Sequence, residues 1–167
     1  RGPDDTAQHQ VDAAVCILKS GGVVAVPTDT VYGLAACAFD TAAIERIFRL
    51  KRRPRGMALP LLLAEPEDIS RYAAHVPEVA WTLVERFWPG ALTIIVRKVQ
   101  EIPEVATGGM DSIALRVPDH PVPREIVRRL GVPITGTSAN HSGGPEVTAA
   151  GDVSDRFGTE LDLVVDV

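Results

Sequence analysis

Apolar and polar positions along the chain follow two periods, one helical and one extended. Helical stripes predict helices over the following ranges: 7–20, 41–50, a segment after Glu65–Pro66, 77–87, 121–130 and 148–157. Short apolar runs predict strands over the following ranges: 23–26, 59–64, 91–96, 112–117, 133–137 and 161–166. Thr41 is the expected N-cap of the second helix, and residues 101–111 are expected to form a loop. Strands mixed with helices, some joined by tight turns, favour an α/β fold with a mixed sheet.

Length and composition are those of one ordinary globular domain. The chain has 167 residues, of which 46% are apolar and 23% charged. No run of about 18 apolar residues occurs, so no membrane span is expected. Cys16 and Cys37 lie in apolar stretches without CxxC spacing. This favours two buried thiols in a cytoplasmic protein, with a disulfide between them as the alternative.

The formal net charge of -5 argues against a protein that holds a long nucleic acid by itself. Positive charge is instead concentrated within ten residues, in this cluster: Arg46, Arg49, Lys51, Arg52, Arg53 and Arg55. One dense basic spot on an acidic protein indicates a small anionic ligand. Within that cluster, Lys51 and Arg53 could hold phosphates or a carboxylate. The alternative is a solvated cluster that meets the dipole at a helix C-terminus.

Three further polar clusters lie at strand ends or in the loops between the predicted elements. The loop that starts at Ser138-Ala139-Asn140 could wrap phosphate oxygens with main-chain N–H groups, or could be an ordinary turn. The loop Thr28–Thr30 could bind a small polar ligand through hydroxyls, or could be a turn with a self-bonded aspartate. Nearby, Tyr32 is either a site wall or a half-buried aromatic. Neither a P-loop nor a GxGxxG fingerprint occurs.

Arg116 is a cation in an otherwise apolar, alternating strand, and Ser112 begins that strand. The Arg116 side chain should point away from the face that carries Leu115 and Val117. If that opposite face lines a cleft, the guanidinium can clamp a carboxylate; if the face meets solvent, Arg116 is merely exposed.

Hydrolytic sites find little support in the sequence. The four histidines are scattered without HExxH or other metal-ligand spacing, and no GxSxG elbow occurs, so no protein metal site is predicted. Asp119-His120 is the nearest approach to a catalytic dyad. Because Pro121 follows directly, the pair is interpreted as the start of a helix.

Five motifs together make the chain resemble the YrdC-like family, the L-threonylcarbamoyladenylate synthases. In order, they are Gly22–Leu34, Lys51–Pro54, Trp88–Ile95, Ile113–Pro121 and Thr137–Gly143. The resemblance covers residues 7–167 as a single YrdC-like domain. It implies a twisted mixed parallel and antiparallel sheet, flanked by helices, around a concave and positively charged cavity.

The resemblance also implies roles for particular residues. Threonine would be bound by Thr30, Tyr32 and Arg116, with Arg116 on its carboxylate. ATP would be surrounded by Lys51, Arg53, Ser112, Ser138 and Asn140. Lys51 and Arg53 would be the catalytic cations. L-threonine, bicarbonate and ATP would be the substrates, Mg²⁺ would bridge the phosphates, and a downstream tRNA-modifying transferase would use the product, with direct contact to tRNA left open.

Two features depart from the family pattern. Residues 57–63 are longer and fully apolar where the family carries a polar or histidine residue. A final Ser-Thr-Val-Val-Asp strand, which the family places after a Gly-rich turn, is expected to be missing. Two alternatives stay open: a non-catalytic RNA- or nucleotide-binding paralogue, and a domain from a carbamoyltransferase of hydrogenase maturation.

Overall fold

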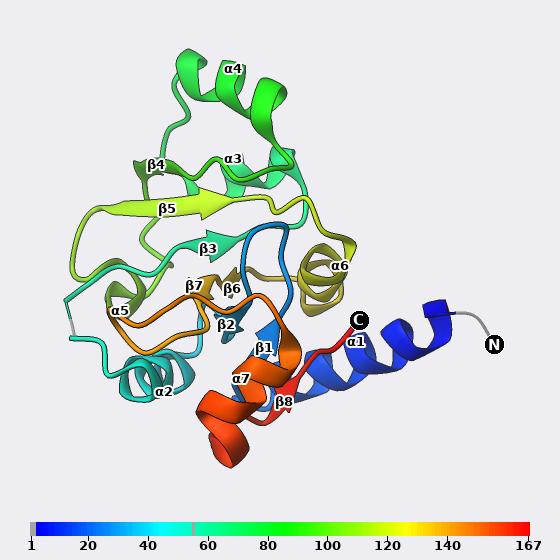
Figure 1. Ribbon diagram of the computed structural model, residues 1–167. Helices are drawn as coiled ribbons and strands as arrows, with labels where there is room; N and C mark the ends of the chain where they lie inside the picture. The colour runs from blue at the N-terminus through cyan, green and yellow to red at the C-terminus, as the bar shows by residue number, and fades with distance from the viewer. Residues whose placement is uncertain (1–2, 55) are drawn as a thin grey trace.

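The computed structural model describes residues 3–54 and 56–167 and shows a mixed α/β fold. Its strands form two four-stranded sheets, with the orders β7-β2-β1-β8 and β4-β5-β3-β6 (Figure 1). The strands are β1 Val24–Val26, β2 Gly33–Ala35, β3 Leu61–Leu62, β4 Ile94–Arg97, β5 Ser112–Arg116, β6 Ile134–Thr135, β7 Thr137–Ser138 and β8 Leu163–Val164. Each sheet holds one parallel pair, β1 with β8 and β3 with β5, so both are mixed. The predicted fold class is confirmed.

The helices agree closely with the apolar stripes of the sequence. They are α1 Pro3–Lys19, α2 Thr41–Lys51, α3 Ile69–Tyr72, α4 Glu78–Phe87, α5 Glu104–Thr107, α6 Pro121–Leu130 and α7 Ala150–Phe157, with short 3-10 turns at Pro66–Asp68 and Gly158–Glu160. The short helix α5 lies in the segment expected to be a loop. Its Ala106 is fully buried and its C=O accepts from the N–H of Leu59, so tertiary packing stabilises a turn that periodicity does not indicate.

The N-cap of α2 is Asp40, and the expectation that Thr41 caps this helix is wrong. The Asp40 carboxylate accepts a hydrogen bond from the N–H of Ala43 at 3.0 Å, which satisfies one of the free donors of the first turn. At the other end, Arg52 takes a left-handed conformation with a φ of 53°. The helix therefore ends at Lys51, and the side chain of this last residue is buried rather than exposed to solvent.

The strand expected over residues 133–137 divides at Gly136, which places β6 and β7 in different sheets. A Cβ atom at Gly136 would lie 2.6 Å from Cγ of Leu62, so only glycine fits this crossing. Thr135 joins the two sheets, since its hydroxyl accepts from the N–H of Ala36 at 3.0 Å and contacts the C=O of Leu34 at 3.2 Å. The expectation of a single sheet is thus corrected to two mixed sheets connected through β2 and β6.

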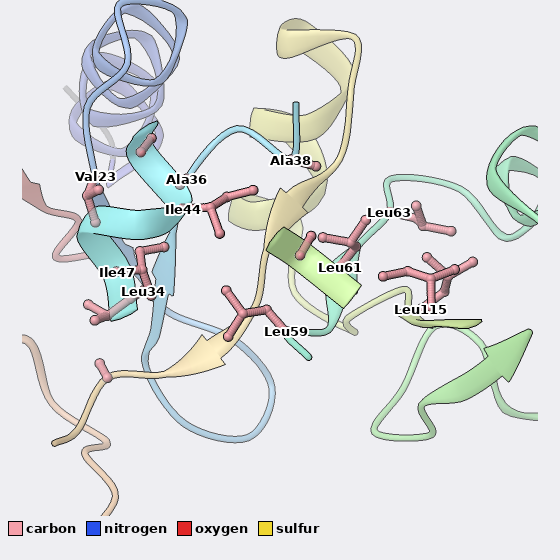
Figure 2. Close-up of a cluster of buried hydrophobic side chains, with 14 of the residues drawn as sticks. Val23, Leu34, Ala36, Ala38, Ile44, Ile47, Leu59, Leu61, Leu63 and Leu115 are labelled. Atoms are coloured by element: carbon pink, nitrogen blue, oxygen red, sulfur yellow. The ribbon is translucent and has the colours of Figure 1, made fainter. Parts of the chain in front are cut away.

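One hydrophobic core runs across both sheets. Figure 2 shows Leu34 of β2 near Ile44 and Ile47 of α2, with Leu61 of β3 and Leu115 of β5 continuing the same cluster. A second cluster lies where α1 and α6 pack beside β1 and β3. Each Å² of apolar surface removed from water stabilises the fold by about 25 cal/mol. The packed core therefore holds the strand ends, from which the polar loops emerge, in fixed positions.

The cysteines differ from expectation. Cys16 is exposed and Cys37 is half-buried, and neither forms a disulfide, so the two buried thiols predicted from the apolar surroundings are not observed. Cys16 sits on α1 outside the stripe that packs on the core, a position that local apolar composition does not reveal. Among the described helices, none combines the length and apolar character needed to cross a membrane.

Candidate functional site

Lys51 is a buried cation at the C-terminal end of α2, only 1% exposed. Its Nζ donates to the C=O of Ser138 at 2.5 Å, to the C=O of Asn140 at 2.9 Å and to Oδ1 of Asn140 at 2.9 Å. An ammonium group has three N–H donors, and here each has an oxygen acceptor. The solvated-cluster alternative is therefore wrong for Lys51, and the structure brings Lys51, Ser138 and Asn140 together.

Opposing effects act on the charge of Lys51. Burial, aided by the neighbouring charge of Arg53, lowers the pKa of Lys51 to about 8. The three acceptors favour the protonated form, because a neutral amine offers only two N–H groups for three oxygens. Lys51 is thus a cation near neutral pH that loses its proton within the accessible range.

The loop after β7 is held in one conformation by its own side chains. Ser138 Oγ lies 2.7 Å from Oδ1 of Asn140, and Nδ2 of Asn140 donates to the C=O of Gly144 at 2.8 Å. The N–H of Ser142 donates to the C=O of Lys51 at 2.8 Å. These bonds tie the loop to the end of α2 through backbone and side chain together.

Arg53 is close enough to Lys51 for its charge to act on that ammonium, and part of its guanidinium is unused. Its Nη2 donates to the C=O of Ala58 at 3.0 Å. Within residues 3–54 and 56–167, Arg53 Nε is the buried side-chain polar atom without a hydrogen-bond partner. A buried donor without an acceptor costs roughly 1–3 kcal/mol. Arg55, the last member of the basic cluster, lies outside the described residues.

A second polar cluster centres on Arg116, which is 8% exposed. Arg116 Nη1 lies 2.7 Å from Oδ1 of Asp29 and donates to the C=O of Gly90 at 2.9 Å. Its Nη2 contacts Oγ1 of Thr30 at 3.3 Å. Of the two alternatives for Arg116, solvent exposure is excluded. Asp29, absent from the expected site residues, is its partner across 87 positions of sequence.

The two clusters are neighbours because β2 pairs with β7. Gly33 lies opposite Ser138 in this pair. The N–H of Ala139 donates to the C=O of Tyr32 at 2.7 Å, so the loop that carries Thr30 runs beside the loop that carries Asn140. The loops that carry Thr30 and Asn140 are therefore adjacent in the fold.

Tyr32 and Ser112, which are also expected site residues, are not hydrogen-bonded to Lys51 or Arg116 among the contacts of the described residues. The Tyr32 hydroxyl donates to the C=O of Val165 at 2.8 Å, and burial of the ring, aided by Asp166, raises the pKa of this phenol. Ser112 shares one face of β5 with Arg116, about 13 Å away along the strand. Among the contacts of the described residues, none joins Ser112 to Lys51 or Arg116. Roles for both in ligand binding stay predictions.

His120 confirms the interpretation of Asp119-His120 as a helix start. It is the N-cap of α6, and its Nδ1 accepts from the N–H of Val122 at 3.1 Å. Burial lowers the pKa of His120, while the charges of Asp29 and Asp119 act in the opposite direction. In the part of the chain that the structure describes, no group of three or more His, Cys, Asp or Glu side chains could hold a metal ion.

Comparison with known protein families identifies the family of this chain. A family model described as Telomere recombination, for the Sua5, YciO and YrdC proteins, matches residues 16–167. The chain belongs to the Sua5/YciO/YrdC family. A threonylcarbamoyl-AMP synthase of Pyrococcus abyssi is 38% identical over 159 residues, which cover 95% of this chain and 47% of the relative. One of Halorhodospira halophila is 34% identical over 163 residues, covering 98% and 85%.

Solved structures of this family have the same fold. P. abyssi Sua5 complexed with L-threonine is 38% identical, with a TM-score of 0.90 over 93% of this chain and 46% of that protein. E. coli YciO is 29% identical, with a TM-score of 0.85 over 96% of this chain and 79% of YciO. The chain spans about half the length of the Pyrococcus and Bacillus relatives, 47% of each. The resemblance to the YrdC-like family is confirmed.

Proposed function

We propose that this Sua5/YciO/YrdC domain makes threonylcarbamoyl-AMP and pyrophosphate from L-threonine, bicarbonate and ATP. The observation that carries the proposal is the adjacency of two polar clusters through the pairing of β2 with β7, one that holds Arg116 and Thr30 and one that holds Lys51 and Asn140. The names of its relatives and the threonine complex of P. abyssi Sua5 support it. The product would pass to a tRNA-modifying transferase.

Two bond-forming steps make up the proposed reaction. The amine of threonine, arriving as an ammonium, combines with bicarbonate to give a carbamate, one water and one proton. A carbamate oxygen then attacks the α-phosphorus of ATP, and the bond from this phosphorus to the pyrophosphate oxygen breaks. Both steps depend on bringing anions together and on compensating phosphate charge, which requires positioned cations rather than a protein nucleophile.

The residues divide into two roles under this proposal. Arg116 would take the threonine carboxylate, with the Thr30 hydroxyl beside it. The Arg53 guanidinium, of which Nη2 is bonded to the C=O of Ala58, and the N–H groups of the loop after Ser138 would meet phosphate oxygens. Ser112, on the Arg116 face of β5, lies where a long ligand could reach. Mg²⁺ characteristically binds through substrate phosphates with few protein ligands, which fits a site whose described residues form no metal cluster.

Pyrophosphate release tests the proposal directly. We expect release from ATP only when both L-threonine and bicarbonate are present, measured with the full-length protein. A non-catalytic nucleotide-binding paralogue would bind ATP without releasing pyrophosphate. A carbamoyltransferase domain would release it without threonine, and either result would overturn the proposal.

The titration of Lys51 predicts a pH dependence of ATP binding. As pH rises through about 8, Lys51 loses its proton and can no longer satisfy all three acceptors of the loop. We expect ATP affinity to fall roughly tenfold between about pH 7 and about pH 9, the size of one charge-assisted hydrogen bond. Calorimetric titration without threonine or bicarbonate checks this, since their own titrations then play no part. An affinity that stays constant across pH 8 would contradict the assignment.

A further inference from the structure

Asp29 and Arg116 form an ion pair in which each partner keeps unused hydrogen-bonding capacity. Their side chains are 16% and 10% exposed, so both are largely removed from water. Arg116 commits Nη1 to Asp29 Oδ1 and to the C=O of Gly90, and one Nη2 proton to Thr30. Among the contacts of the described residues, Nε and the second Nη2 proton of Arg116 have no partner, and neither does Oδ2 of Asp29.

The unused atoms belong to groups of opposite charge that are joined in one ion pair. A guanidinium presents its N–H groups in a planar fork that matches the two oxygens of a carboxylate. Oδ2 of Asp29 is a charged acceptor suited to an ammonium group. In an α-amino acid, the carboxylate and the ammonium are attached to the same carbon, so one ligand offers a complementary group to each partner of the pair.

We propose that Asp29 binds the α-ammonium group of the amino-acid substrate while Arg116 binds its carboxylate, so that the pair recognises the zwitterion. This inference rests on the proposed function, because it assigns the amino-acid half of the same site. Asp29 would then make one interaction with each oxygen. Oδ1 holds Arg116 in place, and Oδ2 accepts a hydrogen bond from the α-ammonium group, which favours ligands with a free amine. The amine is the group that must become the carbamate, so Asp29 holds the reacting nitrogen.

The turn around Asp29 supports this placement. The Thr28 hydroxyl accepts from the N–H of Thr30 at 3.2 Å and donates to the C=O of Val31 at 2.6 Å. Among the contacts of the described residues, none is a bond from the Asp29 carboxylate to its own turn. Instead, threonine holds the turn, and the Asp29 carboxylate is left to reach Arg116.

Two ligands and the variant Asp29→Asn separate recognition of the amine from support of Arg116. The ligands are L-threonine and the hydroxy acid in which a hydroxyl replaces its α-amine. Asparagine keeps an oxygen for Arg116 but loses the negative charge. We expect L-threonine to bind the variant about 10- to 100-fold more weakly by calorimetry, and the hydroxy acid to bind variant and wild type within about threefold.

The matched control is Asp119→Asn, which removes the same charge from an exposed loop near His120. It should leave the affinities of both ligands unchanged. Equal weakening of both ligands by Asp29→Asn would overturn the inference, since Asp29 would then act only through Arg116. Unchanged threonine affinity would overturn it as well. Binding is measured without turnover, so these outcomes stand apart from any failure of pyrophosphate release, which bears on the proposed function.

Discussion

Replacing Lys51 with methionine should reduce pyrophosphate release by about 100-fold, because a loop displaced by even about 1 Å no longer positions the substrate for reaction. Methionine fills a similar volume but offers no N–H group. The C=O groups of Ser138 and Asn140 would then lose the donor that orients them. Because the loop after β7 depends on this anchor, we expect kcat to fall and the KM for ATP to rise, measured by steady-state pyrophosphate release.

Lys98→Met is the matched control for that variant. Lys98 also donates from Nζ to a backbone C=O, that of Ile102 at 3.2 Å, but it is half-exposed and lies outside both clusters. Its loss should change turnover by less than about twofold, since surface substitutions rarely exceed about 0.5 kcal/mol. Equal effects of the two substitutions would show that general loss of charge, rather than the anchoring of the loop, lowers the rate.

Arg116→Met should abolish measurable L-threonine binding at millimolar concentrations and destabilise the fold by about 3–5 kcal/mol. Methionine leaves the Asp29 carboxylate without its cation and the C=O of Gly90 without its donor. Calorimetry checks the first effect, and urea denaturation checks the second. If the variant still bound L-threonine, the assignment of Arg116 to the threonine site would be wrong.

A double variant separates these two effects. Arg116→Met combined with Asp29→Asn removes both charges of the pair, so much of the lost stability should return while threonine binding stays absent. Arg124→Met serves as a control for the loss of an ion pair elsewhere. Arg124 lies on α6, and its Nη2 is 2.9 Å from Oε2 of Glu65. It should leave threonine affinity unchanged.

Much of the fold follows from local pattern. The alternation of Ile113, Leu115 and Val117 predicts β5 and the face it buries, and all three residues are fully or almost fully buried. The opposite face then carries Arg116, as the same alternation requires. The division at Gly136 could not be predicted, because the constraint is the side chain of Leu62, which reaches this position only through tertiary packing.

The site shows the same limit. Lys51 looks like one of six exposed cations in the sequence, and its burial depends on acceptors 87 and 89 positions away. Asp29 gives no local sign of its partner, since β5 and the β1–β2 loop meet only after folding. Motif order identified which segments matter, while the pairing of individual groups required the three-dimensional structure.

The parallel pairing of β1 with β8 has a consequence for how the protein folds. Beside these strands, the N–H of Val23 donates to the carboxylate of Asp162, which is 139 positions away in the sequence. The side chain of Gln10 on α1 donates to the C=O of Asp166, which is 156 positions away. Contacts between residues so far apart in sequence raise the contact order. The chain must lose the entropy of closing a large loop before these contacts can form. The β7-β2-β1-β8 sheet is therefore expected to complete late, after hairpin-like pairs such as β1 with β2 and β4 with β5 have formed.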